Sequence, residues 1–248
     1  MDVCIPPLGF LNTGAICYFN SLVQSLLSCK PFLVFLCKEE NHESLFYYFL
    51  RFISIDKQWD PQFTTRLLQL MNVFEPNQSS SEYFLKLCDY LKMDDLFQSK
   101  TETITTCEEC KTESKRIDTS VYFLIDNEIT EFCETKRSIE GFQCDTCKKK
   151  VNATLVTKIN QISSIMVFSF NKYFGKKNIH YPKGFIIEDK KYQLVSTIEH
   201  HGDLNGGHYY CRTVRNGELL CIDDMNVSKM DSIDPTENTY MVFYEFVN

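Results

Sequence analysis

Two Cys-x-x-Cys pairs constrain the fold of this chain more than any other feature of its sequence. Cys107-Glu-Glu-Cys110 and Cys144-Asp-Thr-Cys147 each offer two thiolates with the spacing of a zinc-ligand pair. Four thiolates complete a closed tetrahedral site, so a shared ion would force the two segments to meet. Residues 111–143 are then expected to form an extended excursion of strands, tied by the metal at its base or its tip. Ordinary surface thiols or redox pairs are the alternative.

Composition limits the class of protein. The chain has 248 residues, 44% of them hydrophobic, which is enough for one or two domains. A formal charge of −7 and a pI of about 5.3 argue against a nucleic-acid-binding surface. No stretch of about 18 apolar residues occurs, so no membrane span is expected. We expect a monomer.

The 12 cysteines are compatible either with disulfides in a secreted protein or with free thiols and metal ligands. Met1-Asp2-Val3-Cys4 has no basic region that leads into an apolar run, so no signal peptide is expected. A reducing compartment, the cytoplasm or the nucleus, is therefore favoured.

The hydrophobic pattern changes near residue 100. Residues 15–97 are mostly helical in pattern, including the aromatic segment Ser44–Ile55 and an apolar stripe at helical spacing over Glu82–Lys92. β-branched and aromatic residues then predict strands, at Val121–Ile125, Ile165–Phe170 and Tyr240–Val247. Helices followed by strands predict an α+β fold.

Cys17 is the candidate nucleophile. Leu22 and Leu26 begin an apolar helical pattern directly after it, which places Cys17 at or near a helix N-terminus. There the helix dipole and the free N–H groups are expected to lower the thiol pKa and to hold an oxyanion. Asn12 could add a side-chain donor. A small buried apolar residue is the alternative role for a free cysteine.

Asn216-Gly217 between two strand-like segments is the strongest short signal for a β-hairpin. A two-residue turn at this position pairs Arg215 with Glu218. Counting back along both strands then pairs Tyr210 with Asp223.

His208 is the candidate general base. In this register His208 and Asp223 share a face as diagonal neighbours, whereas Asp224 pairs with Tyr209 and points to the opposite face. Asp223 would fix the tautomer and orientation of the imidazole, and His208 would deprotonate Cys17 and later protonate the leaving amine. A β-bulge would reverse the choice of carboxylate, and an ordinary strand histidine is the alternative for a lone residue.

These segments together resemble the ubiquitin-specific proteases. Gly9–Gln24, the two Cys-x-x-Cys pairs and Tyr192–Asp224 resemble that family's cysteine box, finger and histidine box. Gln78–Phe84 resembles its Gln-Asp-Ala-x-Glu-Phe segment. Gly141–Cys147 followed by Ile165–Phe170 resembles its passage from finger to palm. The motifs occur in the family's order over essentially the whole chain.

The resemblance implies one minimal catalytic domain over residues 1–248 with a papain-like fold. A helical thumb would cover about residues 1–97, zinc-tied β fingers about residues 98–150, and a β-sheet palm about residues 151–248. A structural zinc ion would be held by Cys107, Cys110, Cys144 and Cys147.

The resemblance also implies hydrolysis of the isopeptide bond after the C-terminal glycine of ubiquitin, carried on modified proteins. Cys17 would be the nucleophile, His208 the general base and Asp223 the third member of the triad. Asn12 would serve the oxyanion hole, and Asp224 matches an accessory acidic residue. The residues expected to contact the modifier are Gln78, Glu82, Gly207 and Tyr209.

Ser79 departs from the family pattern, because the family usually carries at this position an aspartate that helps to hold the basic tail of ubiquitin. Glu82 remains nearby. Two alternatives therefore stay open: a protease for a ubiquitin-like modifier, and an inactive relative that only binds ubiquitin.

Overall fold

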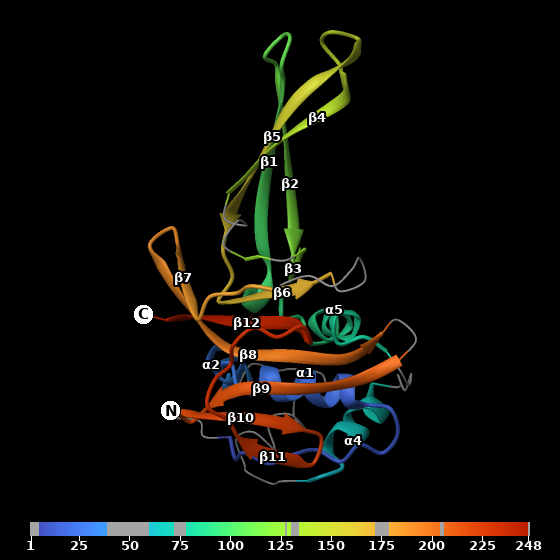
Figure 1. Cartoon of the computed structure of the whole chain (residues 1–248), viewed down its shortest axis with the longest axis vertical. Helices are drawn as coiled ribbons and strands as arrows, with labels where there is room; N and C mark the ends of the chain where they lie inside the picture. Colours follow the sequence, from blue (N-terminus) through green and yellow to red (C-terminus); the bar gives the residue numbers. More distant parts are fainter. Residues whose placement is uncertain are drawn as a thin grey trace.

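The computed structural model describes residues 5–38, 60–71, 78–126, 128–129, 134–171, 179–203 and 206–247. A body of helices packed on a large sheet carries a long four-stranded sheet that projects away from it (Figure 1). Helices precede strands along the chain, so the predicted α+β order is confirmed.

Within the described ranges the helices lie before residue 98. They are α1 (Cys17–Leu26), α2 (Lys30–Cys37), α4 (Phe63–Leu70), α5 (Ser80–Leu91) and α6 (Asp94–Phe97). Every residue of α1 is buried, so this helix forms the centre of the body. No single described helix is long and apolar enough to cross a membrane. The predicted aromatic helix at Ser44–Ile55 lies outside the described residues.

The large sheet has the strand order β11-β10-β9-β8-β12-β6-β3, with β7 paired to β8. Its strands are β3 (Phe123–Ile125), β6 (Ile165–Phe170), β7 (Gly184–Ile187), β8 (Lys190–Asp203), β9 (Gly206–Arg215), β10 (Glu218–Asp223), β11 (Asn226–Lys229) and β12 (Thr239–Val247). The three predicted strands are confirmed as β3, β6 and β12, although β3 begins only at Phe123.

The central strands of this sheet are buried on both faces. Alternate residues of β6 and β12 enter two different apolar clusters, as the two-residue period of a strand requires. Ile165, Val167, Met241 and Phe243 pack with the helices, whereas Met166, Phe168, Val242 and Tyr244 pack on the opposite face. Helix α1 is thereby held against the sheet that carries His208.

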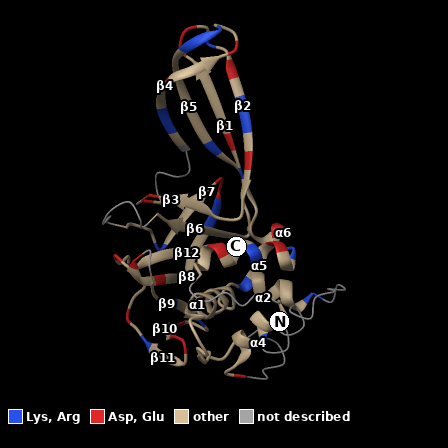
Figure 2. Cartoon of the chain, turned by 90° about the vertical axis from the view of Figure 1, so that its right-hand side faces the viewer, with Lys and Arg blue, Asp and Glu red and all other residues tan. Residues whose placement is uncertain are grey.

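The projecting sheet has the order β2-β1-β5-β4 and is formed by β1 (Ser99–Cys107), β2 (Glu113–Ser120), β4 (Glu134–Cys144) and β5 (Lys149–Gln161). Charged residues of both signs occur along these strands (Figure 2), and β2 is largely exposed. A small cluster of Cys107, Cys144 and Val151 is buried at the far end. The apolar core therefore contributes little to holding this end together.

Candidate active site

The predicted hairpin register is confirmed. Strands β9 and β10 pair Arg215 with Glu218 and continue in step to Cys211 with Ile222. Asn216 and Gly217 form the turn with φ values of 53° and 79°, the left-handed backbone that a two-residue hairpin turn requires.

His208 and Asp223 meet across this hairpin. His208 Nε2 lies 2.5 Å from Asp223 Oδ1, and each side chain is 43% exposed. A carboxylate can only accept a hydrogen bond, so Nε2 carries the proton that it donates, and in the neutral imidazole the lone pair is on Nδ1. The imidazole therefore has one nitrogen available as a base.

Cys17 is the first residue of α1 and is 7% exposed. The backbone N–H of Tyr209, the residue that follows His208, lies close enough to its sulfur to lower the pKa of the thiol, as does the N–H of Tyr18. The helix start and the histidine strand thus converge on one sulfur atom.

Burial raises the pKa of the Cys17 thiol above its ordinary value. The N–H of Tyr209 acts in the lowering direction and the charge of Asp224 in the raising direction, and burial exceeds the lowering contributions. The expectation of a lowered pKa is therefore wrong for the resting protein. The helix N-terminus does supply N–H groups, but the close packing of β9 on the sulfur removes water from it.

Alkylation of Cys17 by iodoacetamide is expected to require a higher pH than alkylation of an unfolded cysteine peptide, whose thiol has a pKa of about 8.5. A raised pKa leaves a smaller thiolate fraction at neutral pH. The measurement is the alkylation rate from about pH 7 to about pH 10, with the modified residue identified by peptide mass spectrometry. A midpoint below that of the peptide would contradict the pKa direction.

Asp224 does not pair with Tyr209 or point away from the site, as the hairpin register had predicted. Strand β10 ends at Asp223, which pairs with Asn226, so Asp224 lies in the turn to β11 with φ of 49°. The alternation of faces stops at this left-handed residue. Ligand atoms of His208, Asp223 and Asp224 consequently all lie within 4.8 Å of one another.

The Asp224 carboxylate holds Asn12. Asn12 Nδ2 donates to Asp224 Oδ2 at 3.0 Å, while Asn12 Oδ1 accepts from the N–H groups of Gly14 at 3.1 Å and Ile16 at 3.2 Å. Two donors on the oxygen and one carboxylate on the nitrogen leave one orientation for this amide. Among the described residues Asp224 is the acceptor for Nδ2, so the second Nδ2 hydrogen can serve an oxyanion.

Two further residues that contact this turn, Asn20 and Gly9, were not identified as site residues from the sequence. Asn20 Nδ2 donates to Asp224 Oδ1 at 2.6 Å. A Cβ on Gly9 would lie 2.2 Å from Asp224 O, so only glycine lets the chain approach closely enough for the Phe10 N–H to bond that oxygen at 2.8 Å. Asn20 follows Cys17 by three residues and so lies on the same side of the helix, and this spacing could have identified it from the sequence.

The start of α5 lies beside the start of α1. Ser80 Oγ donates to the Tyr18 carbonyl at 2.9 Å, next to Cys17. Gln78 is half-buried and Glu82 is exposed. Ser79 is the N-cap of α5, where its hydroxyl accepts from the Glu82 N–H at 3.2 Å.

Gly207 and Tyr209 flank His208 on β9. Gly207 is exposed, and a Cβ there would meet His200 Nε2 at 2.3 Å, so glycine is needed for the His200 ring to fit. The Tyr209 ring is buried and stacks on His200 with 4.3 Å between centroids. Tyr209 therefore presents mainly its backbone to the Cys17 side.

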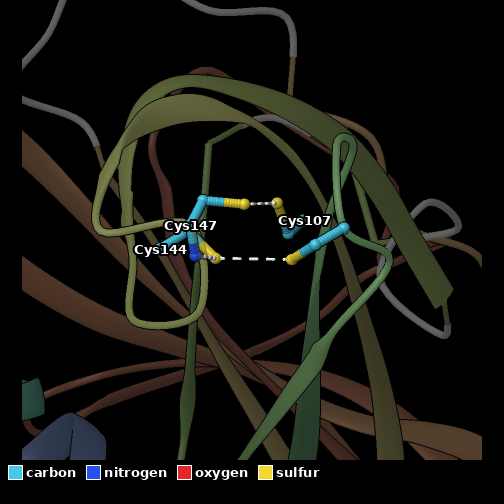
Figure 3. A group of neighbouring side chains, drawn as sticks. Cys107, Cys144 and Cys147 are labelled. Carbon is cyan, nitrogen blue, oxygen red and sulfur yellow. Dashed lines mark hydrogen bonds between the residues drawn. The ribbon is translucent and has the colours of Figure 1, made fainter.

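The four cysteines of the Cys-x-x-Cys pairs meet where β1 and β4 end, at the far end of the projecting sheet. Figure 3 labels three of them and shows Cys107 facing Cys147. The four sulfurs lie within 4.8 Å of one another, with 3.9 Å between Cys107 and Cys147 and 3.6 Å between Cys110 and Cys144. The prediction that these segments converge is confirmed, and the meeting point is the tip. These residues could hold a metal ion.

The two cysteine turns have the same backbone geometry. Lys111 and Lys148, each directly after a second cysteine, have φ values of 61° and 55°. Their N–H groups bond the carbonyl of the first cysteine, Cys107 at 3.0 Å and Cys144 at 2.8 Å. Two matching turns that point four thiols at one spot are the geometry expected of a ligand cage.

Two of these thiols differ in acidity. The Thr112 hydroxyl and N–H lower the pKa of Cys110 to about 6, while hydrogen bonding from Cys110 together with partial desolvation raises the pKa of Cys147 to about 12. A thiolate at Cys110 thus opposes ionisation of Cys147. A bound divalent cation would instead favour the thiolate form of both.

A sequence model of one family, described as ubiquitin carboxyl-terminal hydrolase, matches residues 8–244. The chain belongs to this family. The resemblance to ubiquitin-specific proteases is thereby confirmed.

Known members of the ubiquitin carboxyl-terminal hydrolase family align over parts of the chain. A probable ubiquitin carboxyl-terminal hydrolase of Acanthamoeba polyphaga mimivirus is 30% identical over 133 residues, 45% of this chain and 28% of the relative. Probable ubiquitin carboxyl-terminal hydrolase 4 of Schizosaccharomyces pombe is 24% identical over 132 residues, 43% of this chain and 22% of the relative. The matched segments thus cover less than a third of the length of these relatives.

Solved structures support the fold. The SAGA Ubp8/Sgf11/Sus1/Sgf73 DUB module bound to ubiquitin aldehyde matches with a TM-score of 0.80 at 15% identity, over 97% of this chain and 70% of the matched chain. The Ubp8-Sgf11-Sgf73-Sus1 SAGA DUB module matches with a TM-score of 0.80 at 15% identity, over 97% of this chain and 68% of that one. The predicted thumb, palm and finger fold is confirmed.

Proposed function

We propose that this chain is a thiol-dependent hydrolase that cleaves the isopeptide bond after the C-terminal glycine of ubiquitin on modified proteins. The observation that carries this proposal is the convergence at Cys17. The N–H of Tyr209, the residue after His208, lies close enough to the Cys17 sulfur to act on its pKa, and His208 is held by Asp223. Membership of the ubiquitin carboxyl-terminal hydrolase family supports the substrate class.

The geometry supports a two-step acyl transfer. His208 Nδ1 takes the Cys17 proton, and the thiolate attacks the carbonyl carbon of the terminal glycine. Asn12 Nδ2 and the N–H groups at the start of α1 stabilise the oxyanion. His208 then protonates the departing lysine amine, and water hydrolyses the thioester with His208 again as the base.

The test is hydrolysis of a fluorogenic amide of the ubiquitin C-terminus. The wild-type chain should turn over, and Cys17→Ala should not. Cys37→Ala, at the partly exposed end of α2, is the matched control and should keep wild-type activity. Ubiquitin binding without turnover, and without labelling of Cys17 by a ubiquitin-based electrophile, would instead support an inactive binding relative.

Ser79 is the observation that favours a ubiquitin-like modifier as the second candidate substrate. Its hydroxyl caps α5 and also accepts a hydrogen bond from Tyr240 Oη at 3.3 Å. Ser79 can therefore cap the helix as an aspartate would, but it lacks the negative charge of an aspartate. A panel of electrophiles built on different modifiers separates the two candidates. Preference for ubiquitin over every other modifier would remove the second.

We also propose that Cys107, Cys110, Cys144 and Cys147 hold a structural zinc ion. Support comes from four thiols on two matching turns, at the end of a sheet with little apolar core. Zinc would neutralise the thiolates and join the β1–β2 turn to the β4–β5 turn.

Cys107→Ser is expected to lower the zinc content from about one ion per chain to near zero. Amide hydrogen exchange should then accelerate at the ends of β1, β2, β4 and β5 more than in β8–β10, because the metal ties only the tip. Elemental analysis measures the zinc content, and mass spectrometry measures the amide hydrogen exchange. Unchanged metal content and exchange in the variant would show that the zinc assignment is wrong.

A further inference from the structure

A chain of hydrogen bonds runs from helix α4 to the oxyanion-hole residue. The Thr64 hydroxyl donates to Asn20 Oδ1, and Asn20 Nδ2 donates to Asp224 Oδ1 at 2.6 Å. Asp224 Oδ2 then accepts from Asn12 Nδ2 at 3.0 Å. Thr64 and Asn20 are 0% and 2% exposed, so water does not compete for the first bond.

Each bond in this chain has only one possible direction. The Asp224 carboxylate can only accept, so Asn20 must turn its NH₂ group toward it and its oxygen toward Thr64. The Thr64 hydroxyl is then the donor to that oxygen. Without it, Asn20 Oδ1 would be buried without this partner, which favours rotation of the amide away from Asp224.

We propose that Thr64 is a positioning residue for the oxyanion hole. Its hydroxyl fixes Asn20, Asn20 fixes the Asp224 carboxylate, and Asp224 holds Asn12 so that the second Nδ2 hydrogen is offered to the oxyanion. This inference rests on the proposed hydrolase function. Thr64 lies in α4, outside every segment that identified the site from the sequence.

The expected signature is a loss in kcat with little change in KM, because the modifier-binding surface is untouched while an interaction made in the transition state weakens. Deleting an oxyanion donor outright costs about 10²- to 10³-fold in kcat, and loosening one indirectly should cost less. We expect kcat for Thr64→Val to fall about tenfold in hydrolysis of the ubiquitin C-terminal amide.

Helix α4 offers a matched control. Thr65 is the next residue, and its hydroxyl lies 2.7 Å from the exposed Thr13 hydroxyl, outside the bond chain to Asp224. Thr65→Val should therefore keep kcat within about twofold of wild type, and Thr64→Ser should restore it. Equal losses in the two valine variants, or no rescue by serine, would overturn the proposal.

A double-mutant cycle with Asn12→Ala separates positioning from a general structural effect. If Thr64 acts through Asn12, Thr64→Val should change kcat less than about twofold once the Asn12 amide is gone. A full tenfold loss in the Asn12→Ala background would show that Thr64 acts by another route.

One measurement needs no turnover. Hydrogen exchange of the Asn12 side-chain NH₂, followed by NMR, should accelerate in Thr64→Val and not in Thr65→Val. Absence of wild-type turnover contradicts the proposed function, whereas unchanged Asn12 exchange in Thr64→Val contradicts the positioning role. The two failures are thus distinguishable.

Discussion

Replacing Asp223 with alanine is expected to lower kcat for ubiquitin-amide hydrolysis by about 10³-fold or more, since loss of the carboxylate that fixes the tautomer of a catalytic histidine has effects of this size. His208 Nε2 donates to Asp223 Oδ1 at 2.5 Å. Without that acceptor the imidazole rotates and no longer keeps Nδ1 as the basic nitrogen. Steady-state kinetics of the purified variant measures the loss.

Two variants at this turn provide the controls. Asp223→Asn keeps the size of the side chain and should lose about as much activity as Asp223→Ala, because its NH₂ group can donate to Nε2 and hold the opposite tautomer. Asp224→Ala should cost about 10²-fold, because it loosens Asn12 and leaves His208 held. A larger loss for Asp224→Ala than for Asp223→Ala would reverse the assignment of the two carboxylates.

Glu199→Gln is expected to lower the free energy of unfolding by about 3–5 kcal/mol, the usual effect of leaving a buried charge without its partner. Glu199 is 0% exposed and its Oε1 lies 2.6 Å from an Nη atom of Arg212, whose side chain is 8% exposed. Burial acts to lower the Arg212 pKa, yet the Glu199 charge raises it overall. Hydroxyls of Thr197 and Thr236 also donate to the carboxylate, at 2.7 and 2.6 Å, as does that of Thr239 at 3.1 Å.

The control is the exposed ion pair between Lys229 and Glu218 in the same sheet, with side chains 77% and 44% exposed. Glu218→Gln should change the free energy of unfolding by less than about 1 kcal/mol. Urea denaturation of both variants measures the difference. Similar small effects would contradict the expectation that the buried Glu199–Arg212 pair contributes more to stability than an exposed ion pair.

Local signals predicted much of this fold. The Asn216-Gly217 turn specified the register of β9 and β10, and through it the meeting of His208 with Asp223. The spacing of the cysteines predicted that residues 107–110 and 144–147 converge. Each of these predictions depends on a turn or a short motif whose geometry is set by neighbouring residues.

What the sequence did not predict depends on how distant segments pack. Strand β9 covers the Cys17 sulfur and reverses the expected direction of its pKa shift. The left-handed backbone of Asp224 brings a side chain into the site that strand alternation had placed on the other face. The Thr64–Asn20 bond joins α4 to α1, and no local pattern marks Thr64.

The central claim is that Cys17 is the nucleophile for a ubiquitin C-terminus. The most direct measurement is intact-mass and peptide mass spectrometry after incubation of the native chain with an electrophile on the C-terminus of ubiquitin. One adduct per chain, mapped to Cys17 among the 12 cysteines and absent in His208→Ala at neutral pH, is the predicted result. An adduct on another cysteine, or none on a chain shown to be folded, would contradict the account.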